Sequence, residues 1–310
     1  MANTPIERGA LVRGFRDAGL QEGDVVLVHS ALRTVGLVQG GATAVAAALL
    51  DVLGARGTLV APTFTFRHEA EPDPIVDPAR DASEMGILSE TIRRHQAARR
   101  SIAFRHSFAS VGRRAEVITQ VDPALPVFDL RSSFGVMLAC NTQVLLLGVT
   151  YSSSTSHHFA EWVCDVPYRH AIPLTAKLRR PDGSLVSLAM TDYQPKPSST
   201  GTYYGTRHTD FNRLGRMLEG RGQVGVAAIG NAVVRRFAMR DLVDLAQVEG
   251  AQNYNIFRTD EGKTGWHDFT PLDFGTIVLS PEMADGAGRP VRYQWSVLDE
   301  AGIAAPRSAG

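Results

Sequence analysis

The chain has 310 residues, of which 44% are apolar and 21% are charged, an ordinary composition for a water-soluble globular protein. Lys plus Arg and Asp plus Glu both number 32, so no global positive charge points to nucleic acid as a partner. No polybasic segment points to a membrane surface, and no apolar run approaches the roughly 20 residues of a membrane span. Two cysteines, Cys140 and Cys164, make no disulfide framework, and the charged N-terminus lacks the apolar core of a signal peptide. We therefore expect a cytoplasmic protein with no nucleic-acid and no membrane partner.

Helices and strands alternate in the N-terminal part of the predicted structure. Apolar residues recur at helical spacing from Ile6 to Ala18, and Gly19 ends that segment. A buried strand is expected at Gly23 to Ser30, a helix at Ala44 to Leu53, and a second buried strand at Gly57 to Thr63. Short connections between alternating helices and strands are typical of α/β winding.

The middle of the chain combines a long loop with further short elements. The stretch from Arg67 to Ala82 holds three prolines and five acidic residues without any periodicity, and we predict a loop there. A helix is expected from Gly86 to Arg94, and a strand from Ser107 to Gly112. Two more helices are expected, at Ala115 to Val121 and at Leu130 to Leu138. These elements continue the α/β pattern.

An unbroken apolar run from Val144 to Val149 is typical of a strand that is buried on both faces of an α/β sheet. A small polar loop, residues 151–154, follows this strand. The segment from about Ser156 then predicts a helix, with Thr155 or Ser156 as its N-cap.

His158 and Glu161 are three positions apart on this predicted helix, so they share one face. A carboxylate in that position holds an imidazole in one tautomer and makes it a better base. The place also suits chemistry, because open α/β sheets bind ligands beyond the C-terminal ends of their strands. A surface helix with an incidental histidine and glutamate is the alternative that the spacing alone leaves open.

The second half of the chain predicts hairpins and helices. Leu174 to Leu178 and Ser184 to Met190 flank Pro181-Asp182-Gly183, a turn sequence that predicts an antiparallel hairpin. A loop is expected from Asp192 to Arg207, and a second hairpin around Gly230-Asn231. The remaining expected elements are a helix at Phe211 to Leu218, strands at Val224 to Ile229 and Ala232 to Phe237, and a helix at Met239 to Gln247.

Polar residues stand at the ends of several predicted strands. His29 and Ser30 end the first strand, Thr63 ends the second, and Ser107 begins a later one. If these strands are neighbours in one sheet, the polar groups meet at one edge, together with the histidine–glutamate helix. Backbone N–H groups of the loop from Ser30 to Gly36 are candidates for holding an anion, although a plain structural turn is the alternative. The loop matches neither a P-loop nor a dinucleotide-binding fingerprint.

Metal and serine-hydrolase sites are not predicted. His157 and His158 are adjacent and face different ways on a helix. His68-Glu69-Ala70-Glu71 is not the His-Glu-x-x-His pattern that puts two imidazoles on one face. A serine hydrolase would show a Gly-x-Ser-x-Gly elbow, and the chain has none. We therefore expect no metal ion at the site.

Short motifs along most of the chain occur in an order that points to one family. The first group is Val28 to Leu32, Gly36, Gly40 to Ala42, and Gly57 to Thr63. The later motifs are Gly86 to Glu90 with Arg93, Arg100-Ser101, Ser107 to Gly112, Leu145 to Val149, Thr155 to Glu161, Asp210-Phe211, and Gly225 to Asp244. In this order, over about Ile6 to Ala246, the chain resembles the aminoglycoside 3-N-acetyltransferase family, whose members acetylate antibiotics.

The resemblance implies a three-layer α/β/α fold around a central mixed sheet, with additional β-hairpins in the C-terminal half, and one domain over residues 1–310. It implies transfer of an acetyl group from acetyl-CoA to an amine, with His158 as the catalytic imidazole and Glu161 as its carboxylate partner. The residues implied to lie along the coenzyme are His29, Ser30, Ala31, Leu32, Arg33, Thr34, Val35, Gly36, Ser107 and Phe108. The residues expected to contact the amine acceptor are Thr63, Phe64, Thr155, His157 and Asp210.

The chemistry of such a reaction fits a histidine base. An ammonium group is not nucleophilic, so a base must hold the deprotonated amine beside the thioester, which is worth roughly 10²–10⁴-fold in rate. Backbone N–H groups or the hydroxyl of Thr155 would stabilise the oxyanion that forms. We expect direct attack by the amine and not a cysteine acyl-enzyme, because Cys140 and Cys164 lie outside the matching motifs.

The chain departs from the family pattern near the expected site. Where the family usually carries His-Pro after its Arg-Ser, this chain has Ala103-Phe104, and His106 lies close by but out of register. Ser30-Ala31 stands where the family usually has Ser-Ser. His157 takes the position before the catalytic histidine, which is commonly aliphatic. A substrate difference is expected to appear at the wall formed by Ala103-Phe104.

Two regions are expected to carry insertions that shape the acceptor pocket, within residues 165–210 and 250–275. Acidic residues in the second region that would suit a polycationic acceptor are Asp260, Glu261, Asp268 and Asp273. The acceptor stays open: an aminoglycoside is expected, and another amine from a biosynthetic pathway is the alternative. A hydrolase in which the same pair activates water, and a binding protein without turnover, are two further hypotheses. A homodimer is an open alternative to a monomer.

Overall fold

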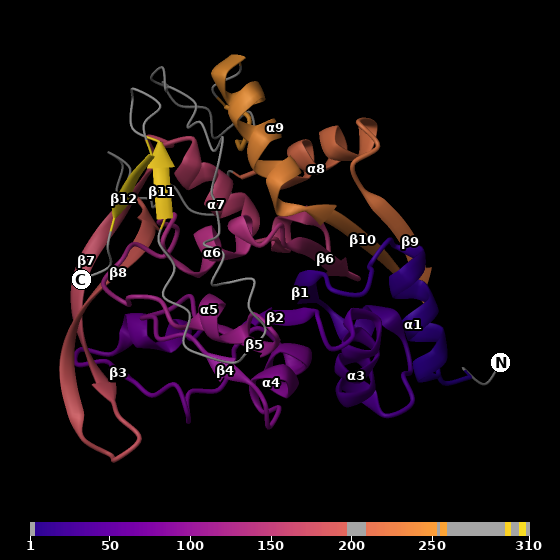
Figure 1. Ribbon diagram of the computed structural model, residues 1–310, viewed down its shortest axis with the longest axis horizontal. Helices are drawn as coiled ribbons and strands as arrows, with labels where there is room; N and C mark the ends of the chain where they lie inside the picture. Colours follow the sequence, from indigo (N-terminus) through magenta and orange to yellow (C-terminus); the bar gives the residue numbers. More distant parts are fainter. Residues whose placement is uncertain (1–3, 197–208, 253–254, 259–294, 299–303, 308–310) are drawn as a thin grey trace.

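A mixed sheet lies at the centre of the computed structural model, which describes residues 4–196, 209–252, 255–258, 295–298 and 304–307 (Figure 1). Seven of the described strands form it, in the order β4-β5-β2-β1-β6-β10-β9. Their bounds are β1 Val25–Ser30, β2 Thr58–Pro62, β4 Arg99–Arg100, β5 Phe108–Gly112, β6 Gln143–Leu147, β9 Gly225–Ile229 and β10 Ala232–Ala238. β1 is parallel to β2 and β6, whereas β5 and β10 run antiparallel to their neighbours. The expected mixed sheet is therefore confirmed.

Side chains of the inner strands are buried on both faces of this sheet. In β1, Val26 and Val28 belong to one hydrophobic cluster, whereas Val25 and Leu27 belong to the other. Successive side chains of a strand point to opposite faces, so an unbroken apolar run needs helices on both sides. This is why the apolar runs of the sequence read as buried strands.

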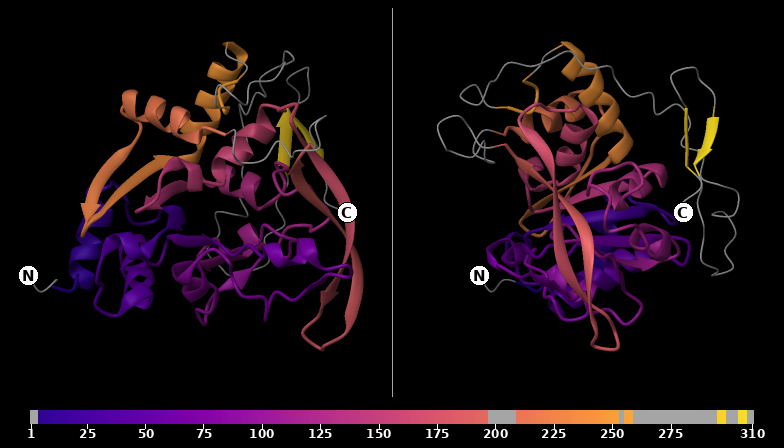
Figure 2. Two further views of the ribbon diagram at one scale, coloured as in Figure 1. Left: turned by 180° about the vertical axis from the view of Figure 1, so that it is seen from behind. Right: turned by 90° about the vertical axis from the view of Figure 1, so that its left-hand side faces the viewer.

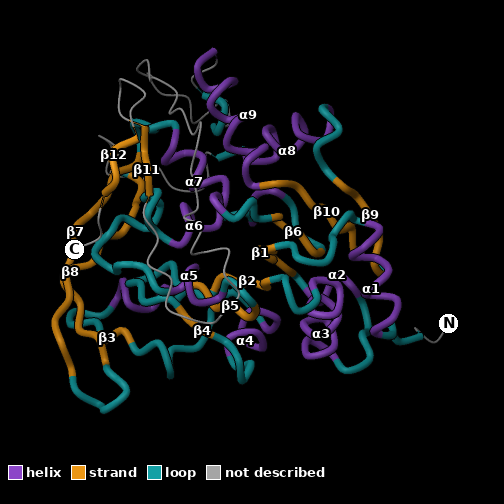
Figure 3. The backbone as a smooth tube through the Cα atoms, in the orientation of Figure 1, coloured by secondary structure: helices purple, strands orange, loops and turns teal. Residues whose placement is uncertain are grey.

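Helices cover both faces, which confirms the three-layer α/β/α architecture (Figures 1 and 2). One layer holds α1 Arg8–Asp17, α3 Gly41–Leu53 and α4 Ile87–Arg93. The other layer holds α5 Ala115–Thr119, α6 Ser133–Ala139, α7 Ser156–Val163, α8 Phe211–Gly220 and α9 Met239–Gln252. Within this second layer α6 and α7 are neighbours (Figure 3), and the rings of Phe134 and Phe159 stack with centroids 5.6 Å apart. That contact anchors α7 on the core.

A long hairpin stands beside the central sheet (Figure 2). Its strands are β7 Arg169–Arg179 and β8 Leu185–Pro195, with Arg169 opposite Pro195. The pairing confirms the first predicted hairpin and extends it at both strands. Residues 192–195, expected as the start of a loop, continue β8 instead, because β7 begins early enough to pair with them. Residues 197–208 of that expected loop lie outside the described part of the chain.

The second predicted hairpin, β9–β10, is confirmed around Gly230-Asn231 but is not a separate unit. β10 pairs antiparallel with β6, so the hairpin forms one edge of the central sheet. Val234 and Phe237 of β10 enter the clusters on opposite faces, which extends the core. A further antiparallel pair, β11 Trp295–Leu298 and β12 Ala304–Arg307, is also present.

Several short elements are not anticipated by the sequence. α2, Leu32–Val35, is one helical turn directly after β1, and η2, Tyr151–Ser153, is a 3₁₀ turn before α7. The stretch from Arg67 to Ala82, which is expected as a loop, includes the strand β3 Ile75–Val76 and all but the first residue of the 3₁₀ turn η1 Phe66–Ala70. None of the described helices is long and apolar enough to cross a membrane.

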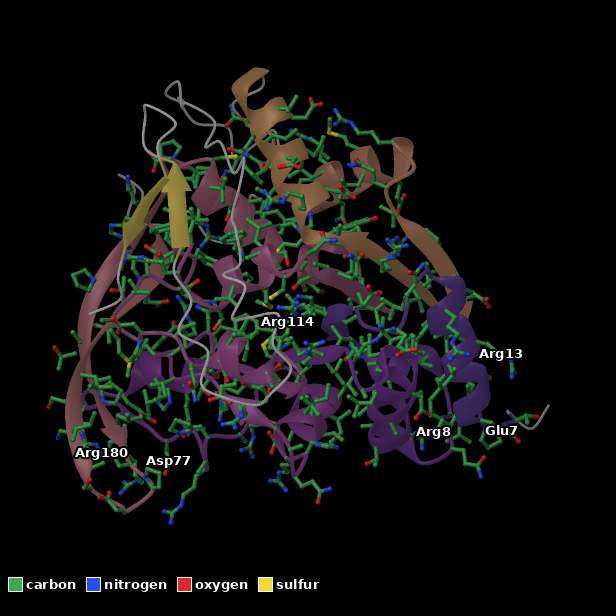
Figure 4. All side chains as sticks on the ribbon, in the orientation of Figure 1. Glu7, Arg8, Arg13, Asp77, Arg114 and Arg180 are labelled. Atoms are coloured by element: carbon green, nitrogen blue, oxygen red, sulfur yellow. The ribbon has the colours of Figure 1, made fainter. Side chains whose placement is uncertain are left out.

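The stretch from Arg67 to Ala82 is tied to the hairpin and to the sheet. β3 pairs in parallel with β7, and Asp77, labelled in Figure 4, forms an ion pair of 3.2 Å with Arg179. The guanidinium of Arg100 donates to the carbonyl oxygens of Pro78 and Asp81, at 3.1 and 2.5 Å. These contacts fix the position of a segment whose sequence shows no apolar periodicity.

A buried histidine completes this anchoring. His68 Nε2 lies 3.0 Å from Asp81 Oδ2, and Nδ1 lies 3.2 Å from Glu71 Oε2. Burial alone would lower the pKa of His68, but hydrogen bonds and charges from Asp81 and Glu71 outweigh it and raise the pKa above 6.5. The two carboxylates therefore favour the protonated ring.

Replacing His68 by glutamine should lower the free energy of unfolding at pH 6 by about 1.5–3 kcal/mol, as for hydrogen bonds to charged groups. Because the folded pKa is raised, the protonated ring contributes fully below its unfolded value, and that contribution is lost as pH rises through the folded pKa. The loss on substitution should therefore be smaller at pH 9. Urea unfolding of both proteins at the two pH values measures it, and an equal or larger loss at pH 9 would contradict the assignment.

Candidate active site

The C-terminal end of β6 leads into the helix that carries the predicted pair. Gly148 follows β6 with φ 68°, a left-handed conformation that glycine adopts at no steric cost, and it turns the chain into η2. α7 then begins at Ser156 with Thr155 at its N-cap. The Thr155 side chain makes no capping hydrogen bond, so its hydroxyl is not used by the helix. The predicted helix start is confirmed in position.

His158 and Glu161 are brought together on α7 as their spacing predicts. His158 Nδ1 lies 2.6 Å from Glu161 Oε2. The imidazole side chain is 20% exposed, whereas the glutamate side chain is 0% exposed. A buried carboxylate at Nδ1 favours the tautomer with the proton on that nitrogen, which leaves the Nε2 lone pair for chemistry.

Two residues after α7 complete the surroundings of the Glu161 carboxylate. The hydroxyl of Tyr168 donates to Oε1 at 2.8 Å, and Arg169 Nε forms an ion pair with Oε2 at 2.8 Å. Tyr168 and Arg169 are themselves buried. Each carboxylate oxygen is therefore occupied, which is the condition for keeping a charged group in the protein interior.

The electrostatics of the pair follow from these contacts. Burial alone would raise the pKa of Glu161, but Arg169 and His158 hold that pKa below its ordinary value. Burial lowers the pKa of His158, and Arg169 lowers it further, while Glu161 opposes both. The pair is thus an ionised carboxylate beside a neutral imidazole near neutral pH. A neutral imidazole is the form that can accept a proton.

Aromatic rings surround His158. Phe211, the first residue of α8, packs edge-to-face on the imidazole with centroids 4.8 Å apart. Phe128 lies 6.4 Å from the same ring and 5.8 Å from the ring of His106. Asp210 precedes Phe211 and forms an ion pair of 3.5 Å with Arg216. These rings exclude water from one side of the imidazole and hold His106 next to the site.

His106 belongs to a second buried charge cluster at the hairpin base. Its Nδ1 lies 3.6 Å from Asp192 Oδ1 on β8, and Arg105 bonds Asp192 Oδ2 at 2.5 Å. Burial and the charge of Arg105 lower the pKa of His106 to about 3, against the opposing charge of Asp192. The cluster therefore presents a neutral second imidazole beside His158.

The loop after β1 lies against the loop after β6. The backbone N–H of Ala31 donates to Leu147 O at 3.0 Å, and the hydroxyl of Thr34 lies 3.1 Å from Gly148 O. β1 and β6 are parallel neighbours, so their C-terminal ends meet at the same edge of the sheet. The α7 pair and the predicted coenzyme loop are therefore adjacent.

Thr63 and Ser107 reach the same edge from β2 and β5. Pro62 is opposite Phe108 in this antiparallel pair, and the two hydroxyls lie 3.0 Å apart. Arg100 Nε bonds both of them, at 3.2 and 3.1 Å. The predicted convergence of strand-end polar groups is confirmed, with Arg100 as the cation that joins them.

Comparison with known proteins shows the family of the chain. Residues 27–249 match the model of the family described as aminoglycoside 3-N-acetyltransferase. The chain belongs to this family. It is 30% identical over 263 residues to aminoglycoside N(3)-acetyltransferase VII of Streptomyces paromomycinus, a match that covers 77% of this chain and 90% of that protein. The family makes the protein an acyltransferase.

Solved structures of aminoglycoside acetyltransferases share the fold. The apoenzyme of AAC(3)-IVa superposes with a TM-score of 0.66 at 26% identity, covering 84% of this chain and 94% of that one. The binary complex of AAC-IIIb with CoASH superposes with a TM-score of 0.69 at 22% identity, covering 80% and 97%. The second likeness concerns the fold. The α/β/α fold described above is therefore shared with solved aminoglycoside acetyltransferase structures.

Several side chains expected to touch ligands are enclosed by protein in this family member. The buried ones are His29, Val35, Thr63, Phe64, Ser107, Phe108, Thr155 and His157. Contacts from these positions to a ligand would have to come from backbone atoms or follow a rearrangement. The expected positions with partly or fully exposed side chains or backbone are Ser30, Ala31, Leu32, Arg33, Thr34, Gly36 and Asp210.

His157 is the clearest departure from its expected place. Its ring is fully buried and stacks on Phe211, with centroids 5.0 Å apart. Adjacent helix residues are turned by about 100° from one another, so His157 enters the core while His158 faces the site. The side chain of His157 therefore has no exposed surface that an acceptor could contact in this structure.

Buried polar atoms without partners lie near the edge where the coenzyme is expected. Within the described residues, no hydrogen bond satisfies His29 Nε2, either ring nitrogen of His157, or the hydroxyls of Ser154 and Ser156. Burial lowers the pKa of His29 to about 4, and that of His157 to about 3, so both rings are neutral. Buried polar groups in folded proteins nearly always have a partner, so a bound polar ligand or water suits this place.

Phe104 and His106, in the segment that departs from the family pattern, pack in different places. Phe104 joins the small cluster of Val76, Leu178 and Met190 under the hairpin. His106, two residues further on, packs its ring 4.7 Å from Phe64 on the site side. The out-of-register histidine is therefore the one that borders the site.

Sequence reasoning misses Tyr168, Arg169, Arg105 and Asp192, because no motif marks them. Arg169 and Asp192 belong to the hairpin, Tyr168 directly precedes it, and Arg105 is held there through its ion pair with Asp192. Pro167 marks the place where α7 gives way to the hairpin, directly before Tyr168 and Arg169. Within the described residues, no group of three or more His, Cys, Asp or Glu side chains is placed to hold a metal ion.

Proposed function

We propose that this protein is an acetyl-CoA-dependent N-acetyltransferase that acetylates an amine of an aminoglycoside-type acceptor, with His158 as the general base. The observation that carries the proposal is the 2.6 Å contact between His158 Nδ1 and the buried Glu161, with the imidazole partly exposed. Family membership supports the acyl transfer, and the relatives' names supply the acceptor class.

The proposed reaction is a direct transfer. The neutral amine attacks the thioester carbonyl carbon, so a C–N bond forms, the C–S bond breaks, and the coenzyme leaves as a thiolate. His158 Nε2 takes the proton that the amine loses and can return it to the thiolate, while Glu161 stabilises the imidazolium. Backbone N–H groups would stabilise the oxyanion, and the hydroxyl of Thr155, which does not cap α7, would join them after a rearrangement that uncovers it.

The coenzyme is proposed to lie along the loop from Ser30 to Gly36. This loop adjoins Gly148 at the edge that also bears α7. The unsatisfied Nε2 of His29 and hydroxyl of Ser156 lie at the start of this loop and of α7. After a rearrangement that uncovers them, they would suit the amide groups of a pantetheine arm. The solved complex of AAC-IIIb with CoASH, a protein of the same fold, supports a coenzyme of this kind.

The acceptor is the less constrained half of the proposal. The buried carboxylates beside His158 are already paired, Glu161 with Arg169 and Asp192 with Arg105. Carboxylates for the ammonium groups of an aminoglycoside would therefore come from elsewhere. The expected ones, Asp260, Glu261, Asp268 and Asp273, lie outside the described residues. Another amine acceptor is the alternative that this pairing favours.

A panel of amine acceptors with acetyl-CoA, followed by release of free thiol, tests the proposed function. We expect thiol release that depends strictly on the amine, with acetylated product confirmed by mass spectrometry. Release at the same rate without any amine would instead support a hydrolase. Tight binding of coenzyme or acceptor without any turnover across the panel would support a binding protein.

A further inference from the structure

The base of the hairpin β7–β8 carries a cation that acts on the catalytic pair from outside α7. Arg169 is the first residue of β7, and its Nε lies 2.8 Å from Glu161 Oε2, the same oxygen that lies 2.6 Å from His158 Nδ1. Both ends of this ion pair are almost fully buried. The oxygen is thus shared between an imidazole and a guanidinium.

We propose that Arg169 is a positioning residue that keeps Glu161 ionised and holds His158 as a neutral imidazole with Nε2 free to accept a proton. The proposal rests on the proposed role of His158 as a base. Without a fixed cation, a buried glutamate beside a histidine would either take up a proton or strongly favour the imidazolium. An imidazolium cannot remove a proton from an amine, so the pair would be a poor base near neutral pH.

The tertiary structure fixes Arg169 in place by more than the ion pair. Its guanidinium lies over the ring of Tyr193, 5.7 Å from the centroid, and Tyr193 packs against Trp162 of α7 at 5.2 Å. Tyr193 belongs to β8, so the pairing of β7 with β8 builds this seat. The hairpin therefore holds the cation against Glu161 and against α7 itself.

The contact acts mainly through charge. Arg169 Nε has no hydrogen-bond partner within the described residues, although it lies 2.8 Å from Glu161 Oε2. The directed hydrogen bonds to Glu161 come instead from His158 and from the hydroxyl of Tyr168. A lysine at position 169 would keep a cation near the carboxylate, and a glutamine would not.

Other charged and titratable groups also lie around the histidine–glutamate pair. Arg105 and His106, from the segment before β5, also act on His158, and Asp192 of β8 is paired with Arg105. Arg258 lies over the ring of Tyr168, 4.3 Å from its centroid. Burial, and after it the charge of Glu161, raises the pKa of Cys164 at the end of α7. Arg169 contacts the carboxylate of Glu161 directly, at 2.8 Å.

The pKa directions agree with this geometry. Arg169 is the largest influence that lowers the pKa of Glu161, against the opposing effect of burial. After burial, it is also the largest influence that lowers the pKa of His158. Removing its charge should therefore raise the pKa of His158.

The test is a histidine titration by NMR on the full-length protein without ligands, which does not depend on turnover. The chain has nine histidines, and a His158→Gln variant identifies the resonance. In the unaltered protein, His158 should titrate below the ordinary value of about 6.5. In Arg169→Gln the midpoint should rise by about one pH unit or more. In Arg169→Lys most of that rise should disappear.

Activity profiles give the matching kinetic readout. The acid limb of the kcat/KM profile should move to higher pH in Arg169→Gln, and the rate should recover at alkaline pH. Tyr168→Phe is the matched control, because it removes a hydrogen bond from the same carboxylate without removing a charge, so its profile should move less. A merely structural loss would lower the rate at all pH values alike.

Two results would overturn the proposal. One is a His158 midpoint at or above 6.5 in the unaltered protein, a measurement that needs no variant to fold. The other is an unchanged or lower midpoint in folded Arg169→Gln. If instead the titrations behave as expected but no amine is acetylated, the proposed function fails and the electrostatic role of Arg169 stands.

Discussion

Replacing His158 by alanine should lower kcat by about 10²–10⁴-fold, the usual worth of a general base, while coenzyme binding is retained. The imidazole is partly exposed and its Nδ1 is bound to Glu161, so the substitution removes the proton acceptor without opening the core. Steady-state rates with acetyl-CoA and the best acceptor measure the loss. Calorimetric titration with coenzyme checks that binding survives.

His170→Ala serves as the matched control for this experiment. It removes the same side chain type from β7, at a partly exposed position twelve residues away from His158. We expect it to keep the activity of the unaltered protein. A purified, folded His158→Ala protein with full activity would remove His158 from the mechanism and would leave the neutral ring of His106 as the next base to examine.

Replacing Glu161 by alanine should lower the free energy of unfolding by about 3–5 kcal/mol, the usual effect of breaking a buried ion pair from one side. The substitution leaves the buried guanidinium of Arg169 without its carboxylate and the hydroxyl of Tyr168 without its acceptor. It also removes the hydrogen bond that fixes the tautomer of His158, so activity should fall as well. Denaturant unfolding at neutral pH measures the stability loss.

The double variant Glu161→Leu with Arg169→Met provides the control. Replacing both buried charges by apolar groups of similar size is often neutral for stability, because no charge remains unpaired. We expect it to recover much of the unfolding free energy lost in Glu161→Ala while activity stays low. A Glu161→Ala protein as stable as the unaltered one would show that the Arg169 charge is solvated in solution.

Much of the fold is predictable because its periodicities are local. Apolar runs such as Val25 to Val28 and Val144 to Leu147 must be buried on both faces, which requires helices above and below the sheet. The turn at Pro181-Asp182-Gly183 predicts a hairpin for the same local reason, and the structure shows it. The short turns of α2 and η2 carry no such period, so they are not predicted.

The extent and attachment of the hairpins are less predictable. Only the partner strand shows that β8 continues to Pro195, because residues 192–195 have no strand pattern of their own. In the same way, β10 joins the central sheet because β6 offers it an open edge. Strand pairing is a contact between distant segments, and single-sequence patterns do not encode which edge a strand finds.

The sequence by itself determined the histidine–glutamate pair, because His158 and Glu161 lie three residues apart on one helix and helix geometry is local. The resemblance of ordered motifs gave the family, which the comparison confirmed. Only the tertiary structure decided what surrounds the pair: Arg169 from β7, and His106 beside Asp192 of β8. Those groups meet the pair through strand pairing and burial, so their effect on its charge depends on contacts that no local pattern records.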